Sequence, residues 1–254
     1  MLLTLTAAAC FGAGLGTGWL LWGRRDRPPS MSTAPGNADI EGLVFALVNK
    51  ERAAHGLGGV RPEAGLANVA RFHSLDMLRR RFMAHDNPDG EAPADRVARG
   101  HRTLLACKVA ENLASLTSSV PDSPQEAASR LMDGWMKSPG HRANILDRGV
   151  DSLGVGIIQQ GGEVRGTQVF AKHCGYLRSP LPATATTVGI NVTIDSAPGQ
   201  PKFWTTAASQ DSPTHPYRPG QVEPVPAGRH QLHVYYHVDG TSYRGAFGPS
   251  FVVR

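Results

Sequence analysis

Two histidines and one glutamate are the side chains best suited to chemistry in this sequence. His73 falls on the apolar face of a predicted helix, and His141 falls in the first turn of another. Glu111 stands among small apolar residues, which indicates a partly buried carboxylate that needs a partner. Two imidazoles and a carboxylate can satisfy one another, ligate zinc or act as an acid–base set. Taken alone, His73 is more typical of a hydrogen-bonded core histidine than of a ligand.

The elements that must position these residues are helices followed by a small sheet. Asp39 is placed to cap the first helix and Gly56 to stop it. Ser123 and Glu126 form a capping box, with Pro at the first helical position. Alternating apolar residues then indicate paired strands. The helices are expected over about 39–55, 62–81, from 123 and from 138, and the strands over 152–158 and 166–172.

The last part of the chain, residues 183–254, is predicted to be a separate all-β module. Its helical periodicity disappears, and short alternating segments are separated by Pro- and Gly-rich turns. About 70 residues is near the lower limit for independent stability, which favours docking onto the preceding domain. His230, His233 and His237 invite a metal interpretation, but the last two share one strand face, which is more typical of a solvated surface. The expected class is α+β.

Charge and the N-terminal composition bear on partners and location. The formal net charge is +5, but Lys and Arg form no extended stripe, so we expect no nucleic-acid partner. Residues 1–23 carry no charge and are about long enough to cross a bilayer, which needs roughly 20 residues. We interpret them as an export or anchor segment that gives contact with the membrane. Residues 24–38 are expected to be a linker, and residues 39–182 the first domain.

Two cysteines lie outside the N-terminal segment. Cys107 and Cys174 can form a disulfide in an exported chain. Because this bond would close a long loop, it would stabilise the fold by about 4 kcal/mol. The alternative is a pair of buried free thiols.

Several sequence blocks resemble a bacterial member of the CAP superfamily, also called SCP-like, which includes pathogenesis-related and venom-allergen proteins. The match extends over about residues 40–176 and does not include residues 183–254. The blocks are Leu47–Arg52 followed by Gly56 and Leu57, Ala70–Met77, Ala84–Gly90, Ala110–Ala114 and Trp135–Leu146, with Gly154–Gly156 and Thr167–Phe170 after them.

This resemblance implies an α–β–α sandwich with a large open cleft, and a cleft tetrad of two histidines and two acidic residues. Carried over by motif, the histidines are His73 and His141 and the first acidic residue is Glu111; His85 lies in a matching loop outside this set. The second acidic position is Ser138, as is usual in bacterial relatives. Asn144 is expected at the cleft rim or in a structural role, as is Gln168.

The resemblance leaves three functions open. Some family members bind a divalent ion through the two histidines, so the first is an extracytoplasmic binding module that holds Zn²⁺, another divalent cation or a small ligand through His73, His141 and Glu111. The second is a hydrolase of envelope peptides or esters with Glu111 as general base. The third is a lipid or sterol carrier. The partner is therefore a small molecule, a lipid or an envelope component.

Overall fold

The computed structural model describes residues 36–118, 122–186, 189–196, 201–207, 216–239 and 242–254. The predicted export or anchor segment, residues 1–23, and most of the predicted linker lie outside these residues. No helix within the described ranges is both long and apolar enough to cross a membrane.

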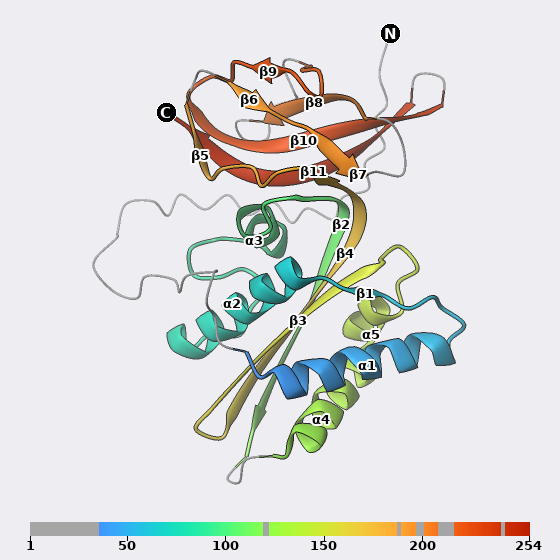
Figure 1. The fold of residues 1–254 in the computed structure, drawn as a ribbon. Helices are drawn as coiled ribbons and strands as arrows, with labels where there is room; N and C mark the ends of the chain where they lie inside the picture. The colour runs from blue at the N-terminus through green and yellow to red at the C-terminus, as the bar shows by residue number, and fades with distance from the viewer. Residues whose placement is uncertain (1–35, 119–121, 187–188, 197–200, 208–215, 240–241) are drawn as a thin grey trace.

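Helices and a central sheet alternate along the first part of the chain, and strands alone make up the last part (Figure 1). The helices are α1 (Ala38–Ala54), α2 (Ala64–Arg80), α3 (Pro93–Gly100), α4 (Pro124–Lys137) and α5 (Pro139–Ile145). The strands are β1 (Arg61–Pro62), β2 (Leu104–Thr117), β3 (Ser152–Gln160), β4 (Glu163–Leu177), β5 (Thr184–Ala185), β6 (Ile190–Asn191), β7 (Ile194–Ser196), β8 (Pro201–Ala207), β9 (Val222–Glu223), β10 (Gly228–Asp239) and β11 (Ser242–Val253).

The start of α1 differs by two residues from the sequence prediction. The side chain of Asn37, not Asp39, caps the helix, because its oxygen accepts a hydrogen bond from the Ile40 N–H at 3.2 Å. Asp39 lies within the first turn instead, where a negative charge interacts favourably with the helix dipole. The predicted stop is confirmed, since Gly56 follows the helix with a φ of 67°.

The predicted capping box of α4 and the paired strands are confirmed. Ser123 and Glu126 exchange side-chain and backbone hydrogen bonds at the start of α4. Strands β3 and β4 form an antiparallel pair along their length. The sequence prediction missed β2 and α3, and it started α2 two residues early, because Pro62 belongs to β1, which pairs with β3.

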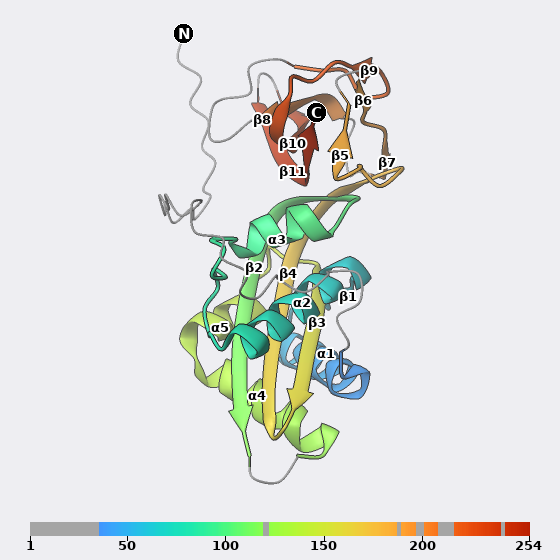
Figure 2. The same cartoon turned by 90° about the vertical axis from the view of Figure 1, so that its left-hand side faces the viewer.

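Helices cover both faces of the sheet formed by β3, β4 and β2, which makes the first part an α–β–α sandwich (Figure 2). Neighbouring residues of β4 show the two faces. Val169 packs with α2 and α3, whereas Phe170 packs with α1, α4 and α5. We call residues 38–177 the helical sandwich.

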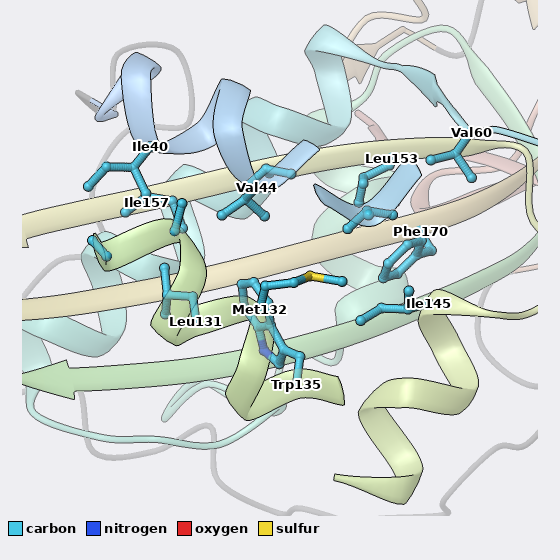
Figure 3. Close-up of a cluster of buried hydrophobic side chains, with 14 of the residues drawn as sticks. Ile40, Val44, Val60, Leu131, Met132, Trp135, Ile145, Leu153, Ile157 and Phe170 are labelled. Atoms are coloured by element: carbon cyan, nitrogen blue, oxygen red, sulfur yellow. The ribbon is translucent and has the colours of Figure 1, made fainter. Parts of the chain in front are cut away.

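The larger core of the helical sandwich lies between the sheet and helices α1, α4 and α5 (Figure 3). Trp135 is the largest side chain in it and is 1% exposed. Its indole N–H donates to the Leu113 carbonyl at 3.0 Å, so the ring both fills the core and fixes α4 on β2.

Residues 184–253, which we call the C-terminal sheet, continue the same sheet through β11, β10 and β8. The predicted alternation along β10 is confirmed: Leu232, Val234 and Tyr236 are buried, while His233 lies on the opposite, more exposed face. Strand β11 pairs with β2 at Phe247 and Ala106. The predicted boundary near residue 183 therefore falls between two parts of one hydrogen-bonded sheet.

A disulfide joins Cys107 of β2 to Cys174 of β4, at a Cα–Cα distance of 6.0 Å. Of the two alternatives left open by the sequence, the structure has the disulfide. Both cysteines pack against the apolar core of the C-terminal sheet. The bond thus lies where the helical sandwich meets that sheet.

Candidate functional site

Glu111 lies in the middle of β2, at the border of the helical sandwich. On one side β2 pairs with β4 along most of its length, and on the other it pairs with β11 at Ala106 alone. The Glu111 side chain is 1% exposed and extends toward α2 and α3, where its partners lie. A buried carboxylate in this position needs compensating charge or hydrogen bonds.

Two partners compensate the Glu111 carboxylate. The Arg96 guanidinium of α3 donates from Nη2 to Oε2 at 2.7 Å, and Nδ1 of His85 lies 2.9 Å from Oε1. Burial disfavours the charged form, but the His85 hydrogen bond and the positive charge of Arg96 outweigh it and hold the pKa of Glu111 below its usual range. Glu111 is therefore ionised at neutral pH, and both of its oxygens are engaged.

His85, in the loop between α2 and α3, is the solvent-facing member of this group. Its side chain is 51% exposed. The hydrogen bond to Glu111 raises the pKa of His85, against the effect of burial and of the Arg96 charge. An ionised carboxylate can only accept, so Nδ1 carries the proton, and in the neutral ring the lone pair is on Nε2. Among the described residues, Nε2 has no hydrogen-bond partner, which makes it available to a ligand.

His73 is near Glu111 but is enclosed. It is 0% exposed, and its Nε2 lies 3.8 Å from Glu111 Oε1 and 3.0 Å from the Ala84 carbonyl. Burial lowers the pKa of His73 to about 4, so the ring is neutral at pH 7. The carbonyl contact requires the proton on Nε2. His73 thus supports the start of the His85 loop, and this geometry does not favour it as a metal ligand.

His141 lies in the first turn of α5, a helix on the other face of the sheet. It is half-buried; burial and the nearby charge of His85 lower its pKa. Asn112 Nδ2 donates to its backbone carbonyl at 3.0 Å and to Gln168 Oε1 at 2.9 Å. Asn144 donates to the Glu111 carbonyl at 3.2 Å and to Asn112 Oδ1 at 2.9 Å. These amides fix α5, and with it His141, against β2.

Ser138, at the second acidic position of the motif, lies between two helices. It ends α4 and begins α5, and the structure shows its backbone, not its hydroxyl, in hydrogen bonds with Trp135 and Arg142. Glu111, the acid predicted from the sequence, therefore contacts His73 and His85, while Ser138 lies at the junction of α4 and α5.

The described residues contain no group of three or more His, Cys, Asp or Glu side chains that could hold a metal ion together. His230, His233 and His237 of the C-terminal sheet likewise form no such group. A closed zinc site with three or four protein ligands therefore does not fit the site. His85 and His141 are the two partly exposed imidazoles of the site, and burial and the charge of His85 lower the pKa of His141.

Comparison with known proteins assigns the helical sandwich to a family. Residues 45–171 match the cysteine-rich secretory protein family, CAP. The chain is a member of the CAP family. This confirms the resemblance found in the sequence and the α–β–α sandwich that it implied.

CAP relatives of this chain come from bacteria. The chain is 28% identical to the uncharacterized protein YkwD of Bacillus subtilis over 138 residues, which are 54% of this chain and 49% of that protein. It is 30% identical to the uncharacterized membrane protein YlbC of the same organism over 117 residues, 46% of this chain and 31% of that one. The chain thus spans about half or less of the curated relatives it matches.

Two solved structures show partial similarity. One is an extracellular protein containing an SCP domain from Bacillus anthracis, with 30% identity, a TM-score of 0.45, and coverage of 54% of this chain and 41% of that one. The other is an outer surface protein from Borrelia burgdorferi, with 16% identity, a TM-score of 0.45, and coverage of 55% of this chain and 99% of that one.

Proposed function

We propose that this CAP protein is an extracytoplasmic binding protein whose site is formed by His85, His141 and Glu111. The exposed Nε2 of His85 and the His141 ring would hold a divalent cation such as Zn²⁺, with Glu111 behind His85. The observation that carries the proposal is the contact of 2.9 Å between the buried Glu111 carboxylate and His85 Nδ1. A carboxylate in this position orients a metal-binding histidine and raises its basicity.

Two imidazoles leave coordination positions for water or for a ligand group. Zn²⁺ takes four ligands in most protein sites, so a two-histidine site would be open and of modest affinity. The bound ion would supply a positive centre that attracts an anionic or carbonyl oxygen of the ligand. His85 and His141 would hold the ion, while Asn112 and Asn144 keep α5 in place.

The site favours binding over the hydrolase alternative. A general base works best with a pKa near the working pH. The pKa of Glu111 is instead held below its usual range, and Arg96 and His85 occupy both of its oxygens. Nor does any observation on the described residues favour the lipid or sterol carrier.

Zinc titration by calorimetry tests the proposal on the full chain. We expect wild-type protein to bind Zn²⁺, and His85→Ala and His141→Ala each to weaken binding at least about tenfold, because each removes one of two ligands. His237→Ala, an exposed histidine of the C-terminal sheet, is the matched control and should bind like wild type. Identical heats for wild type and both site variants would dispose of the metal role.

An extracytoplasmic location is supported by the Cys107–Cys174 disulfide, because disulfides persist in oxidising compartments. The charge-free residues 1–23 are consistent with export or anchoring. Protease treatment of intact cells of the native host checks the location. We expect an exported chain to be cleaved or already in the medium, whereas full protection until lysis would contradict the proposal.

A further inference from the structure

Arg96 of α3 binds both members of the His85–Glu111 pair, the carboxylate of Glu111 and the backbone carbonyl of His85. Its side chain is 0% exposed. Nη2 donates to Glu111 Oε2 at 2.7 Å, and Nη1 donates to the backbone carbonyls of His85 at 2.8 Å and of Glu91 at 2.6 Å. One planar guanidinium therefore links the carboxylate to both ends of the segment that carries His85.

The rest of that segment is held by its own turn and by ion pairs with the neighbouring helices, Arg80 of α2 with Asp89 and Arg99 of α3 with Glu91. Asn87 is buried, and its Oδ1 accepts from the backbone N–H groups of Asp89 and Glu91 at 3.0 and 2.9 Å. These bonds shape the turn but give it no fixed place relative to β2. Arg96 gives it that place, because it binds the His85 carbonyl and the Glu111 carboxylate at the same time.

The geometry points to Arg96 as the positioning residue that fixes the orientation and the tautomer of His85. Arg96 holds Oε2 of Glu111 and so turns Oε1 toward Nδ1, which places the proton of the neutral ring on Nδ1 and the lone pair on Nε2. The inference rests on the proposed function only in taking Nε2 as the ligand atom.

A lysine cannot replace this arrangement. Lys keeps the positive charge but has a compact ammonium in place of a rigid planar fork. It cannot reach the carboxylate and two backbone carbonyls in the directions that Arg96 uses. Arg96→Lys therefore separates the charge of Arg96 from its geometry.

The test measures the His85 tautomer by long-range ¹H–¹⁵N NMR of the full-length protein labelled on histidine. We expect wild-type His85 to show protonated Nδ1 and unprotonated Nε2, and Arg96→Lys to show a mixture of both tautomers. Zinc affinity should fall about tenfold in that variant, the usual effect of losing a residue that orients a ligand.

Arg52→Lys is the matched control. Arg52 is also a buried arginine, 3% exposed, and it binds the carbonyls of Gly58, Ile145 and Asp147, none of which belongs to the segment that carries His85. The Arg52→Lys variant should be less stable than wild type but should show the same His85 tautomer. If Arg96→Lys leaves the tautomer unchanged, or if Arg52→Lys alters it equally, Arg96 has a structural role only and the inference is overturned.

A second pair of variants covers the case in which Arg96→Lys does not fold. Glu111→Gln and the double variant Arg96→Gln/Glu111→Gln both lack the buried anion, and the amide oxygen can still accept from Nδ1. We expect the double variant to show more of the tautomer with the proton on Nε2 than Glu111→Gln does. Equal tautomer populations in the two variants would refute the positioning role. Because this readout needs no zinc, a wild-type protein that fails to bind zinc would contradict the proposed function alone.

Discussion

The helical sandwich and the C-terminal sheet differ in the burial of their ion pairs. In the sandwich, buried carboxylates have arginine partners from distant elements, as with Glu111 and Arg96 or Glu41 and Arg71. Asp195 of the C-terminal sheet instead pairs with Arg178 at the surface, where both side chains are more than half exposed. Buried polar atoms without a hydrogen-bond partner occur among the described residues of both regions, such as Arg96 Nε and Thr205 Oγ1. Directional bonds fix side chains to within a fraction of an ångström, so the sandwich is the part suited to hold a site.

The C-terminal sheet depends on packing instead. Trp204 stacks on Tyr217 with ring centroids 4.4 Å apart, and His230 stacks on Phe251 at 5.4 Å. Apolar packing is less directional than hydrogen bonding, and it stabilises a region without specifying a reactive geometry. The described core of the C-terminal sheet is therefore held mainly by apolar and aromatic contacts.

Three connections nevertheless couple the two regions. The first is the β2–β11 pairing and the second is the pairing of β4 with β7. The third is Arg102, which donates to the carbonyls of Leu181, Pro182 and Ser250. We therefore expect the two regions to unfold together.

The largest effect should come from truncating the central indole of each region. Trp135→Ala and Trp204→Ala each remove a fully buried ring, 1% and 0% exposed, and should each lower the free energy of unfolding by about 3–5 kcal/mol. Guanidinium unfolding followed by far-UV circular dichroism measures this, and coupling predicts one transition for both variants.

Trp135→Phe is the control, because it keeps most of the packing and loses only the bond to the Leu113 carbonyl. Trp135→Phe should lower the free energy of unfolding by less than Trp135→Ala does. A Trp204→Ala protein that keeps a second transition at the wild-type midpoint would show that the two regions unfold independently.

An intermediate effect is expected from removing the disulfide. Cys107 and Cys174 are 67 residues apart in sequence. The double variant Cys107→Ala/Cys174→Ala should lower the free energy of unfolding by about 2–4 kcal/mol, because the unfolded chain regains conformational entropy. Hydrogen exchange should also become faster at Ala106 and Phe247, where the regions pair. Reduction of the wild-type protein should reproduce both changes; an unchanged midpoint after complete reduction would argue against a stabilising disulfide.

The smallest effect concerns Glu63, which joins three elements of the sandwich. Glu63 accepts from Nε2 of His101 at 3.0 Å and from the Tyr176 hydroxyl. The His101 hydrogen bond, with that of Tyr176, lowers the pKa of Glu63 to about 2 although burial opposes it. A lowered folded-state pKa stabilises the protein above the unfolded value of about 4.3, and this stabilisation is lost as the pH falls toward 2.

Glu63→Gln should therefore be less stable than wild type at pH 7, by on the order of 1 kcal/mol, because solvent screens a partly exposed carboxylate. The difference should vanish near pH 2, as measured by thermal unfolding across this range. Tyr176→Phe is the control, since it keeps the charge and the His101 bond and should retain most of the pH dependence. A constant difference between Glu63→Gln and wild type at all pH values would contradict this assignment.

Much of the fold could be predicted from local sequence patterns. The capping box at Ser123 and the alternation of Leu232, Val234 and Tyr236 depend on residues close in sequence, and both are confirmed. Strand β2 was missed because its burial does not alternate regularly: bulges near Cys107 shift its register, and Lys108 and Glu111 interrupt its apolar residues.

The candidate site was only partly predictable. The apolar neighbours of Glu111 showed correctly that its carboxylate is buried and needs partners. His85 carried a weaker signal, since it lies in a polar loop just after the helix of His73. A loop has no periodicity from which its direction could be inferred, so the sequence could not show that His85 faces Glu111.

The sequence by itself determined the family, the main helices and strands, and the need for charge compensation at Glu111. Only the tertiary structure decided that Arg96 and His85 provide it, and that His73 is enclosed beneath them. The reason is physical: a hydrogen bond depends on positions and angles in space. The three groups come from a helix, a loop and a strand whose relative placement is set by the packing of the whole sandwich.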